Sequence, residues 1–174
     1  MKTVFALIVA LLLVGGVEEE PLVKLGEPVR LGGIELTALS VELREISIKQ
    51  PGWPGARVID SAEKYTVLTY KVANVTDVQV IHPGRVPGKI EDQFGNVHKQ
   101  ISGGDICEGC VIVEPNRPVE LLPGDSQVLI VVFEAPKIKK AELFTATLTV
   151  VIDNRGTKAE AGILFERKQL DKSD

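Results

Sequence analysis

Apolar residues in this chain recur in short runs of period two, separated by turn residues. In residues 121–136, LLPGDSQVLIVVFEAP, a Pro-Gly-Asp-Ser turn precedes the apolar run 128–133, and Ala135-Pro136 ends it. A run that is apolar on both faces is typical of a strand covered on both sides. We therefore expect a central core strand here, with other strands layered over it.

The first strand region, residues 34–48, changes its alternation twice. Apolar residues fall on even numbers in 34–38, on odd numbers in 39–43 and on even numbers again in 46–48. Because side chains alternate between faces along a strand, each phase change requires an extra residue. We expect β-bulges, or a switch from one sheet to its partner, near Ala38 and near Arg44 and Glu45.

Strand patterns continue along the rest of the chain, and nothing beyond the N-terminal segment is convincingly helical. In residues 63–74, Tyr65 and Tyr70 fall on opposite faces, so at most one of them is expected to face the core. Turn signals recur at intervals of about 8–12 residues or more, which predicts an all-β, two-sheet antiparallel β-sandwich of about seven to nine strands. The remaining candidate strands are the two sides of the 91–96 turn, 143–152 and 157–165.

The N-terminal segment differs in character from the rest. Lys2 precedes the apolar run 4–14, and Gly15-Gly16 follows it, as in an export signal. The run is shorter than the ~20 residues of a spanning helix, so an uncleaved anchor is the alternative. Both interpretations place the later residues outside the cytoplasm, extracellular, periplasmic or at the cell surface. We expect a signal peptide or short membrane anchor at 1–16, a linker at 17–31, the sandwich at 32–167 and a frayed tail at 168–174.

Composition and charge limit the classes of partner that we expect for this chain. The 174 residues are enough for about one domain with a sizeable core. The formal charge is −4 and no basic patch is evident, so nucleic acid is not an expected partner. A protein or another cell-envelope ligand is expected instead, and contact with the membrane only through an uncleaved N-terminal segment.

Three motifs together resemble a known family. They are the strand ending in Val-Ala-Asn-Val-Thr-Asp at 72–77, the Asp-x-Phe-Gly turn at 92–95, and Leu-Pro-Gly-Asp-Ser at 122–126 leading into Val-Val-Phe-Glu-Ala-Pro at 131–136. Over residues 32–151 the chain resembles the bacterial and archaeal exported immunoglobulin-like domains of unknown function, to which small secreted immunogenic antigens of mycobacteria are also similar. The resemblance implies an immunoglobulin-like β-sandwich and no shared enzymatic activity. This chain lacks the lipoprotein cysteine of that family and carries an insertion at 107–110.

The only cysteines, Cys107 and Cys110, form the most reactive motif, Cys-Glu-Gly-Cys. In an exported protein this spacing favours a disulfide, which would stabilise so small a loop by about 2 kcal/mol. Zinc is one alternative, because His82 and His98 precede the pair and two thiolates with two imidazoles complete a tetrahedral shell. Their spacing matches no standard zinc finger, however. A labile or redox-active thiol pair is the other alternative, although no helix is predicted that would lower a thiol pKa.

Trp53, the only tryptophan, lies in a Pro-Gly-Trp-Pro-Gly loop. A single aromatic on a rigid loop is typical of an interface anchor, which makes Trp53 a candidate for partner binding. The alternative is that its ring folds back over the end of the sandwich. Asn74-Val75-Thr76 is formally a glycosylation sequon, but Asn74 is expected to act as a turn residue.

Catalytic motifs are absent from the sequence. It contains no Gly-x-Ser-x-Gly elbow, phosphate-binding loop or His-Glu-x-x-His. We therefore expect no enzymatic activity and no cofactor beyond the zinc alternative. The expected function is an exported, non-catalytic binding or cell-envelope interaction module with an unidentified partner. The alternative is a metal-handling or thiol-redox periplasmic protein that uses Cys107 and Cys110.

Overall fold

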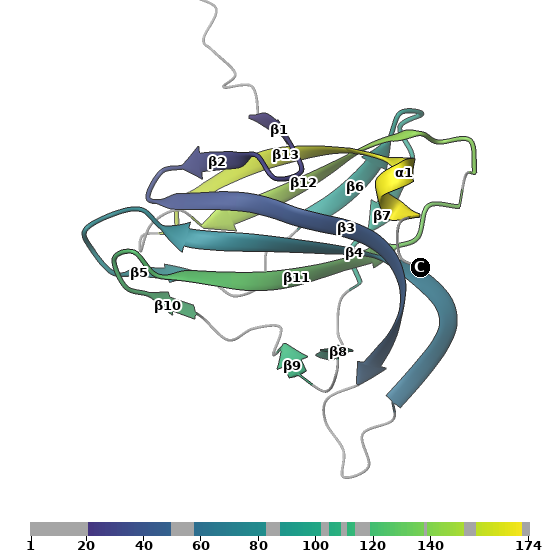
Figure 1. Ribbon diagram of the computed structural model, residues 1–174, viewed down its shortest axis with the longest axis horizontal. Helices are drawn as coiled ribbons and strands as arrows, with labels where there is room; N and C mark the ends of the chain where they lie inside the picture. The colour runs from purple at the N-terminus through teal and green to yellow at the C-terminus, as the bar shows by residue number, and fades with distance from the viewer. Residues whose placement is uncertain are drawn as a thin grey trace, which may run out of the picture.

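The computed structural model describes residues 21–49, 58–82, 88–101, 105–108, 111–113, 119–137, 139–151 and 156–171. These residues form thirteen strands and one short helix (Figure 1). The elements are β1 (Leu22–Lys24), β2 (Pro28–Leu31), β3 (Ile34–Lys49), β4 (Val58–Asn74), β5 (Val80–His82), β6 (Gly88–Asp92), β7 (Val97–Lys99), β8 (Asp105–Glu108), β9 (Val111–Val113), β10 (Val119–Leu121), β11 (Ser126–Glu134), β12 (Leu143–Val151), β13 (Lys158–Glu166) and α1 (Arg167–Leu170).

Two sheets make up the body of the protein. One has the order β1-β13-β12-β6-β7, and the other has the order β11-β4-β3-β8-β9 with β2 paired to β3. Every pairing is antiparallel except that of β1 with β13. A separate ribbon joins β5 to β10. The main strands of both sheets run along the long axis of the molecule (Figure 1). The predicted β-sandwich is thus confirmed, with more short strands than expected.

The core lies between the two sheets and follows the predicted alternation. On β12 the inward residues 144, 146, 148 and 150 are buried, whereas the residues between them are partly exposed. Phe144 stacks on Phe165 of β13 with ring centroids 5.4 Å apart. Tyr70 is 1% exposed and belongs to the same core, while Tyr65 on the opposite face of β4 is half-buried. Burial raises the pKa of Tyr70 well above its usual range.

The two predicted irregularities in the first strand are confirmed. The register between β3 and β4 shifts between Ala38 and Ser40 and again between Glu45 and Ser47. The suggested switch between sheets is wrong, because β3 stays paired with β4 on both sides of each shift. The first shift leaves Leu39 as an extra residue on β3, so the inward-facing set of β3 moves by one position within a single sheet. At the second shift the extra residues lie on β4, between Asp60 and Lys64.

The strand expected at the centre of the core lies instead at the end of its sheet. β11 pairs with β4 along nine residues, and among the described residues its other side makes only a bridge from Phe133 to Gln100 and a hydrogen bond from Ile101 to Val132. Its outward side chains change along the strand, since Val128 is 54% exposed whereas Val132 is 1% exposed. The apolar run is continuous because the outer face of β11 is also buried near Val132. The prediction that this strand lies at the centre of its sheet was wrong.

Two of the expected boundaries also differ from the structure. The segment expected as a linker, 17–31, contains β1 and β2, so the sandwich begins before residue 32. The segment expected as a frayed tail, 168–174, contains most of α1, whose Leu170 is fully buried. α1 is anchored by Arg167, which donates from its backbone to Glu142 and from its guanidinium to Ala141. At four residues, α1 is far too short to cross a membrane, and it is the one helix of the described chain.

Candidate interaction site

A buried carboxylate organises the turn between β6 and β7. Asp92, 5% exposed, accepts hydrogen bonds from the backbone N–H groups of Phe94 and Asn96 at 2.9 and 3.0 Å. The Asn96 side chain donates to both carboxylate oxygens at 3.0 Å. Gly95 adopts φ 81°, a conformation that glycine reaches without strain. This turn is an Asx-type structure built by the local sequence Asp-Gln-Phe-Gly-Asn.

A second set of hydrogen bonds attaches the turn to the start of β12. The Gln93 side-chain oxygen accepts the N–H groups of Glu142 and Leu143 at 3.0 and 2.8 Å. The backbone N–H of Gln93 donates to the Leu143 carbonyl at 3.0 Å. The turn is therefore fixed both internally and against the neighbouring strand.

This fixed turn carries an exposed aromatic ring. Phe94 is 59% exposed, and beside it Val97 and Leu143 are 49% and 40% exposed. We call these three side chains the Phe94 surface. Large apolar side chains gathered on a rigid segment are a feature of binding surfaces.

An open groove adjoins the Phe94 surface on the outer face of β6 and β12. Its volume is about 320 Å³. Most of its lining is polar, and Lys89 and Glu91, two of its three charged residues, approach each other at 3.4 Å. Sites for small apolar ligands are mostly apolar and concave, so this groove does not resemble one. The lining residues are Lys89, Glu91, Asp92, Gln93, Leu143, Thr145 and Thr147.

His98 supports the same turn from inside the sandwich. It lies on β7, is 5% exposed, and its ring centroid is 6.4 Å from that of Phe144. Its Nε2 is 3.9 Å from the Asp92 carboxylate and has no hydrogen-bond partner in the described part of the chain. The guanidinium of Arg167 lies over the same Phe144 ring, 5.5 Å from its centroid.

The electrostatics of this pair are set by burial and hydrogen bonding. Burial lowers the pKa of His98 and outweighs the opposite influence of Asp92 and Glu134, while Lys137 and Arg167 lower it further. Burial alone would raise the pKa of Asp92. The hydrogen bonds from its turn and the nearby imidazole outweigh burial, so the pKa of Asp92 is lowered. The folded protein thus favours a neutral imidazole beside a carboxylate.

Three of the four candidate zinc ligands lie on described strands, and strand pairing does not bring those three together. His82 lies on β5, His98 on β7 and Cys107 on β8, and these strands belong to different pairings. Cys110 lies outside the described residues. Among those described, no group of three His, Cys, Asp or Glu side chains could hold a metal ion. The disulfide, zinc and redox interpretations of the cysteine motif stay predictions.

Strand pairing does place Cys107 close to the connection that carries Trp53. β8 pairs with the end of β3, with Cys107 opposite Ser47 and Asp105 opposite Lys49. The connection from β3 to β4 begins directly after Lys49, and Trp53 within it lies outside the described residues. The paired ends of β3 and β4 curve away from the sandwich, with β8 and β9 beside them (Figure 1). Trp53 stays a predicted anchor.

A second buried polar residue organises the opposite end of the molecule. Asn74 is 2% exposed, and its amide nitrogen donates to the carbonyls of Val78 and Leu121 at 2.7 and 2.9 Å. Its oxygen accepts from the backbone and hydroxyl of Thr76 at 2.9 and 2.7 Å. The turn interpretation of Asn74 is confirmed, and the amide of the formal sequon is engaged inside the fold.

The comparisons with known proteins identify a fold and no family. No protein-family model and no curated protein matches the sequence. Among solved structures, the yjhA protein from Bacillus subtilis is similar with a TM-score of 0.53 at 12% identity, over 81% of this chain and 99% of that one. An uncharacterized β-sandwich protein from Clostridium difficile 630 has a TM-score of 0.48 at 10% identity, over 85% and 94%. At such identities these likenesses concern the β-sandwich fold alone.

The sequence pointed to only part of this site. The turn at residues 91–96 was predicted from its Gly-Asn pair, and its strands are confirmed as β6 and β7. The roles of Asp92 and Gln93 were missed. Asp92 could have been found from its spacing to Asn96, but the partner of Gln93 lies about fifty residues away and carries no sequence signal.

Proposed function

We propose that this chain is an exported, non-catalytic β-sandwich that binds a protein partner in the cell envelope through the Phe94 surface. The observation that carries the proposal is the exposed ring of Phe94 on a turn fixed by Asp92 and Gln93. Export is proposed from the N-terminal segment of the sequence. The motifs shared with exported immunoglobulin-like domains support the same assignment.

The rigidity of the turn supports a binding role on energetic grounds. Burying an aromatic side chain of this size contributes about 1.5–3 kcal/mol. A mobile loop would lose part of that in ordering, whereas the hydrogen-bonded turn is already ordered. An exposed apolar cluster also promotes non-specific association, so its presentation on a built turn favours a specific use.

The two buried ionisable groups near this surface, Asp92 and His98, have structural roles, which supports a non-catalytic function. The Asp92 carboxylate is occupied by the N–H groups of its own turn. His98 is 5% exposed, so a substrate in the groove would not reach its imidazole. General acid–base catalysis requires such groups within hydrogen-bond reach of the substrate.

Complex size in an envelope extract tests the proposal. The wild-type protein is expected to sediment as part of a complex larger than one chain. Phe94→Ser is expected to move it to the monomer position, because the apolar anchor is lost. Leu22→Ser is the matched control, since Leu22 is 60% exposed on β1. Equal behaviour of all three proteins would contradict the proposal.

The thiol or metal alternative has its own test at Cys107 and Cys110. Intact mass with and without reductant, together with metal content, separates the interpretations. A stable two-hydrogen deficit without metal supports a structural disulfide. Stoichiometric zinc would instead favour the metal-handling function, and a readily reduced pair the redox one. Cys107 pairs with Ile112 across β8 and β9, and the last pair of this hairpin is Glu108 with Val111. Gly109 and Cys110 are the two residues between Glu108 and Val111.

A further inference from the structure

His98 lies inside the sandwich next to the carboxylate that fixes the Phe94 turn. The Oδ1 atom of Asp92 accepts hydrogen bonds from the backbone N–H groups of Phe94 and Asn96 and from the Asn96 side chain. The Oδ2 atom accepts another from the same side chain and lies 3.9 Å from Nε2 of His98. The turn thus engages both carboxylate oxygens, and the imidazole lies beside them without a hydrogen bond to either.

The imidazole of His98 is enclosed, yet it belongs to a short strand at the margin of its sheet. Its Nε2 atom is buried and has no hydrogen-bond partner in the described part of the chain. The described side chains around it form no group that could hold a metal ion. β7 has three residues, and of the described strands only β6 pairs with it. Gln100 and Ile101, which follow β7, are bonded to β11, so the free end of this segment is the turn.

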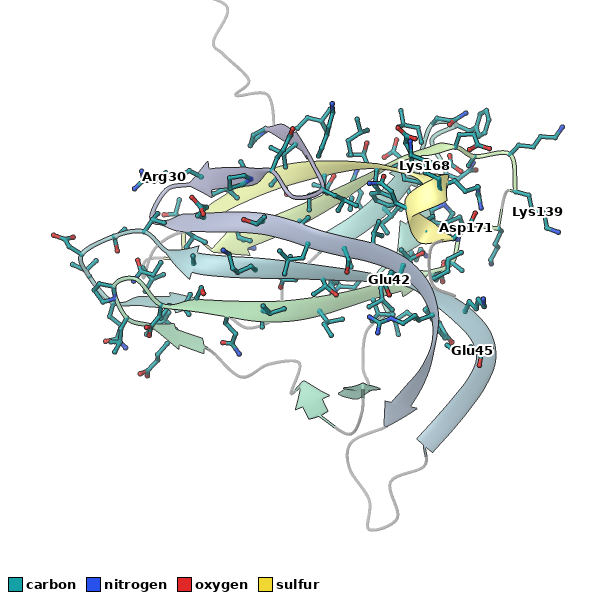
Figure 2. The ribbon with its side chains drawn as sticks, in the orientation of Figure 1. Arg30, Glu42, Glu45, Lys139, Lys168 and Asp171 are labelled. Carbon is teal, nitrogen blue, oxygen red and sulfur yellow. The ribbon has the colours of Figure 1, made fainter. Side chains whose placement is uncertain are left out.

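Charged groups act on His98 from several packed elements. Burial disfavours the charged ring most strongly. Asp92 of β6 and Glu134 of β11 favour it, whereas Lys137 after β11 and Arg167 of α1 disfavour it further. The other charges at this end are of both signs and exposed to solvent, which screens them, as Figure 2 shows around α1. They include Lys99, Lys139, Lys140, Glu142, Lys168 and Asp171.

We propose that protonation of His98 opens the Phe94 turn and so releases the partner of the Phe94 surface. This inference rests on the proposed function, in which that surface is the docking site. An imidazolium carries two N–H donors, yet both oxygens of Asp92 are already engaged by the turn. A charge that stays buried without its hydrogen bonds is unfavourable. The protonated ring is therefore favoured in a state in which it reaches water.

Water reaches His98 when the turn end of β7 separates from β6. Asn96 directly precedes β7, so this movement withdraws its backbone N–H and its side-chain amide from Asp92. The bonds of Gln100 and Ile101 to β11 confine the opening to the turn end, and a short marginal strand opens at low cost. The exposed aromatic ring then lies on a segment that must be ordered again before it binds, which lowers affinity.

Amide hydrogen exchange of the purified protein, with a chelator present, tests the opening without a partner. The open state has an ordinary imidazole with a pKa of about 6.5 and the closed state keeps the ring neutral, so the opening equilibrium should rise about tenfold from about pH 7.5 to about pH 5.5. After correction for intrinsic exchange, the protection of the Phe94 and Asn96 amides should fall by that factor. The Thr76 amide, which bonds to the buried Asn74 at the other end of the molecule, should keep its protection.

Two matched histidine variants, examined also as complexes in envelope extract, test the assignment to His98 and the link to binding. The wild-type complex should move toward the monomer position at about pH 5.5. His98→Gln should keep the turn amides protected and the complex intact at both pH values, because its side chain takes up no proton. His82→Gln should behave as wild type.

The outcomes separate this proposal from the proposed function. Unchanged protection of the wild-type Phe94 amide, or an equal loss at Thr76, overturns the proposal, and this comparison needs no variant. A turn that still opens with acid in His98→Gln overturns it too. A wild-type complex that persists at acid pH although the turn opens also overturns it, and the proposed function stands. A turn that opens as expected, without a Phe94-dependent complex at either pH, overturns the proposed function and with it the release.

Discussion

Asn74 uses its whole side-chain hydrogen-bonding capacity inside the protein. Both amide hydrogens and both lone pairs of the oxygen are engaged, and the residue is almost fully buried. Its partners come from the following turn and from β10, about fifty residues along the chain. One side chain therefore connects the end of β4 to the β5–β10 ribbon.

Removing this amide should destabilise the fold strongly. Asn74→Ala removes the buried hydrogen bond to the Leu121 carbonyl and one of the two donors to the Val78 carbonyl, which also accepts from the Thr76 hydroxyl, at a cost of about 1–3 kcal/mol in the free energy of unfolding. Denaturant unfolding measures the difference. Thr76→Ala, which removes only one partner hydroxyl, should cost less. Equal and small effects from the two substitutions would show that Asn74 does not connect these segments in solution.

His98 should make stability depend on pH. Burial lowers the pKa of His98 in the folded state, so below about pH 6.5 the unfolded chain binds the proton more readily. Stability is therefore full above about pH 6.5 and falls as pH drops from there toward the folded pKa. The lowered pKa of Asp92 acts in a separate window, below about pH 4, where its protonation removes further stability.

Replacing the imidazole should remove the first of these windows. His98→Gln is expected to flatten the pH dependence of the unfolding free energy between about pH 5 and 7, whereas His82→Gln should not change the contribution assigned to His98. Denaturant titrations at several pH values provide the measurement. A dependence that persists in His98→Gln would assign the proton uptake to another group.

Close packing between strands is concentrated at Gly88, the first residue of β6. A methyl group there would lie 2.9 Å from the Thr147 carbonyl oxygen and 3.2 Å from the Phe133 ring. Gly88→Ala should therefore destabilise the protein by about 1–3 kcal/mol through overpacking. At Gly95 no atom lies within 4 Å, and Gly95→Ala should cost about 1 kcal/mol through its positive φ alone. A neutral Gly88→Ala would contradict the packing of β6 against β12 and β11.

Local patterns predicted the elements better than their arrangement. The phase changes near Ala38 and Glu45 identified both register shifts, because alternation is a property of adjacent residues, although the extra residues of the second shift lie on β4. The position of β11 at the end of its sheet could not be read in the same way, since it depends on which strands pair at long range. The same reason explains why the Asp92 turn was recognisable and the Gln93 bridge to β12 was not.

At the scale of the whole molecule, export is the prediction that depends on sequence alone. If residues 1–16 are a signal peptide, the mature protein recovered from its cells should begin near residue 17. When the cells are opened, the protein should be protected from added protease only in the envelope fraction. Intact mass of the recovered protein measures the first point. A full-length mass in the envelope would favour the anchor, and a cytoplasmic full-length protein would contradict export.

Exposed apolar side chains lie at both ends of the whole molecule. A buried polar residue fixes the turn at each end. Asp92 fixes the turn that carries the exposed Phe94, and Asn74 fixes the turn that carries the exposed Val78. The body between them is a sandwich with a continuous core. We propose that the Phe94 end of this body makes the protein's contacts in the cell.

Site-specific photo-crosslinking in living cells tests that claim most directly. A photoreactive residue replaces Phe94 in one strain and Leu22, which has similar exposure, in another. We expect discrete crosslinked products from position 94 and none from position 22, with the partner identified by mass spectrometry. Products that are absent from position 94, or equally abundant from position 22, would contradict it.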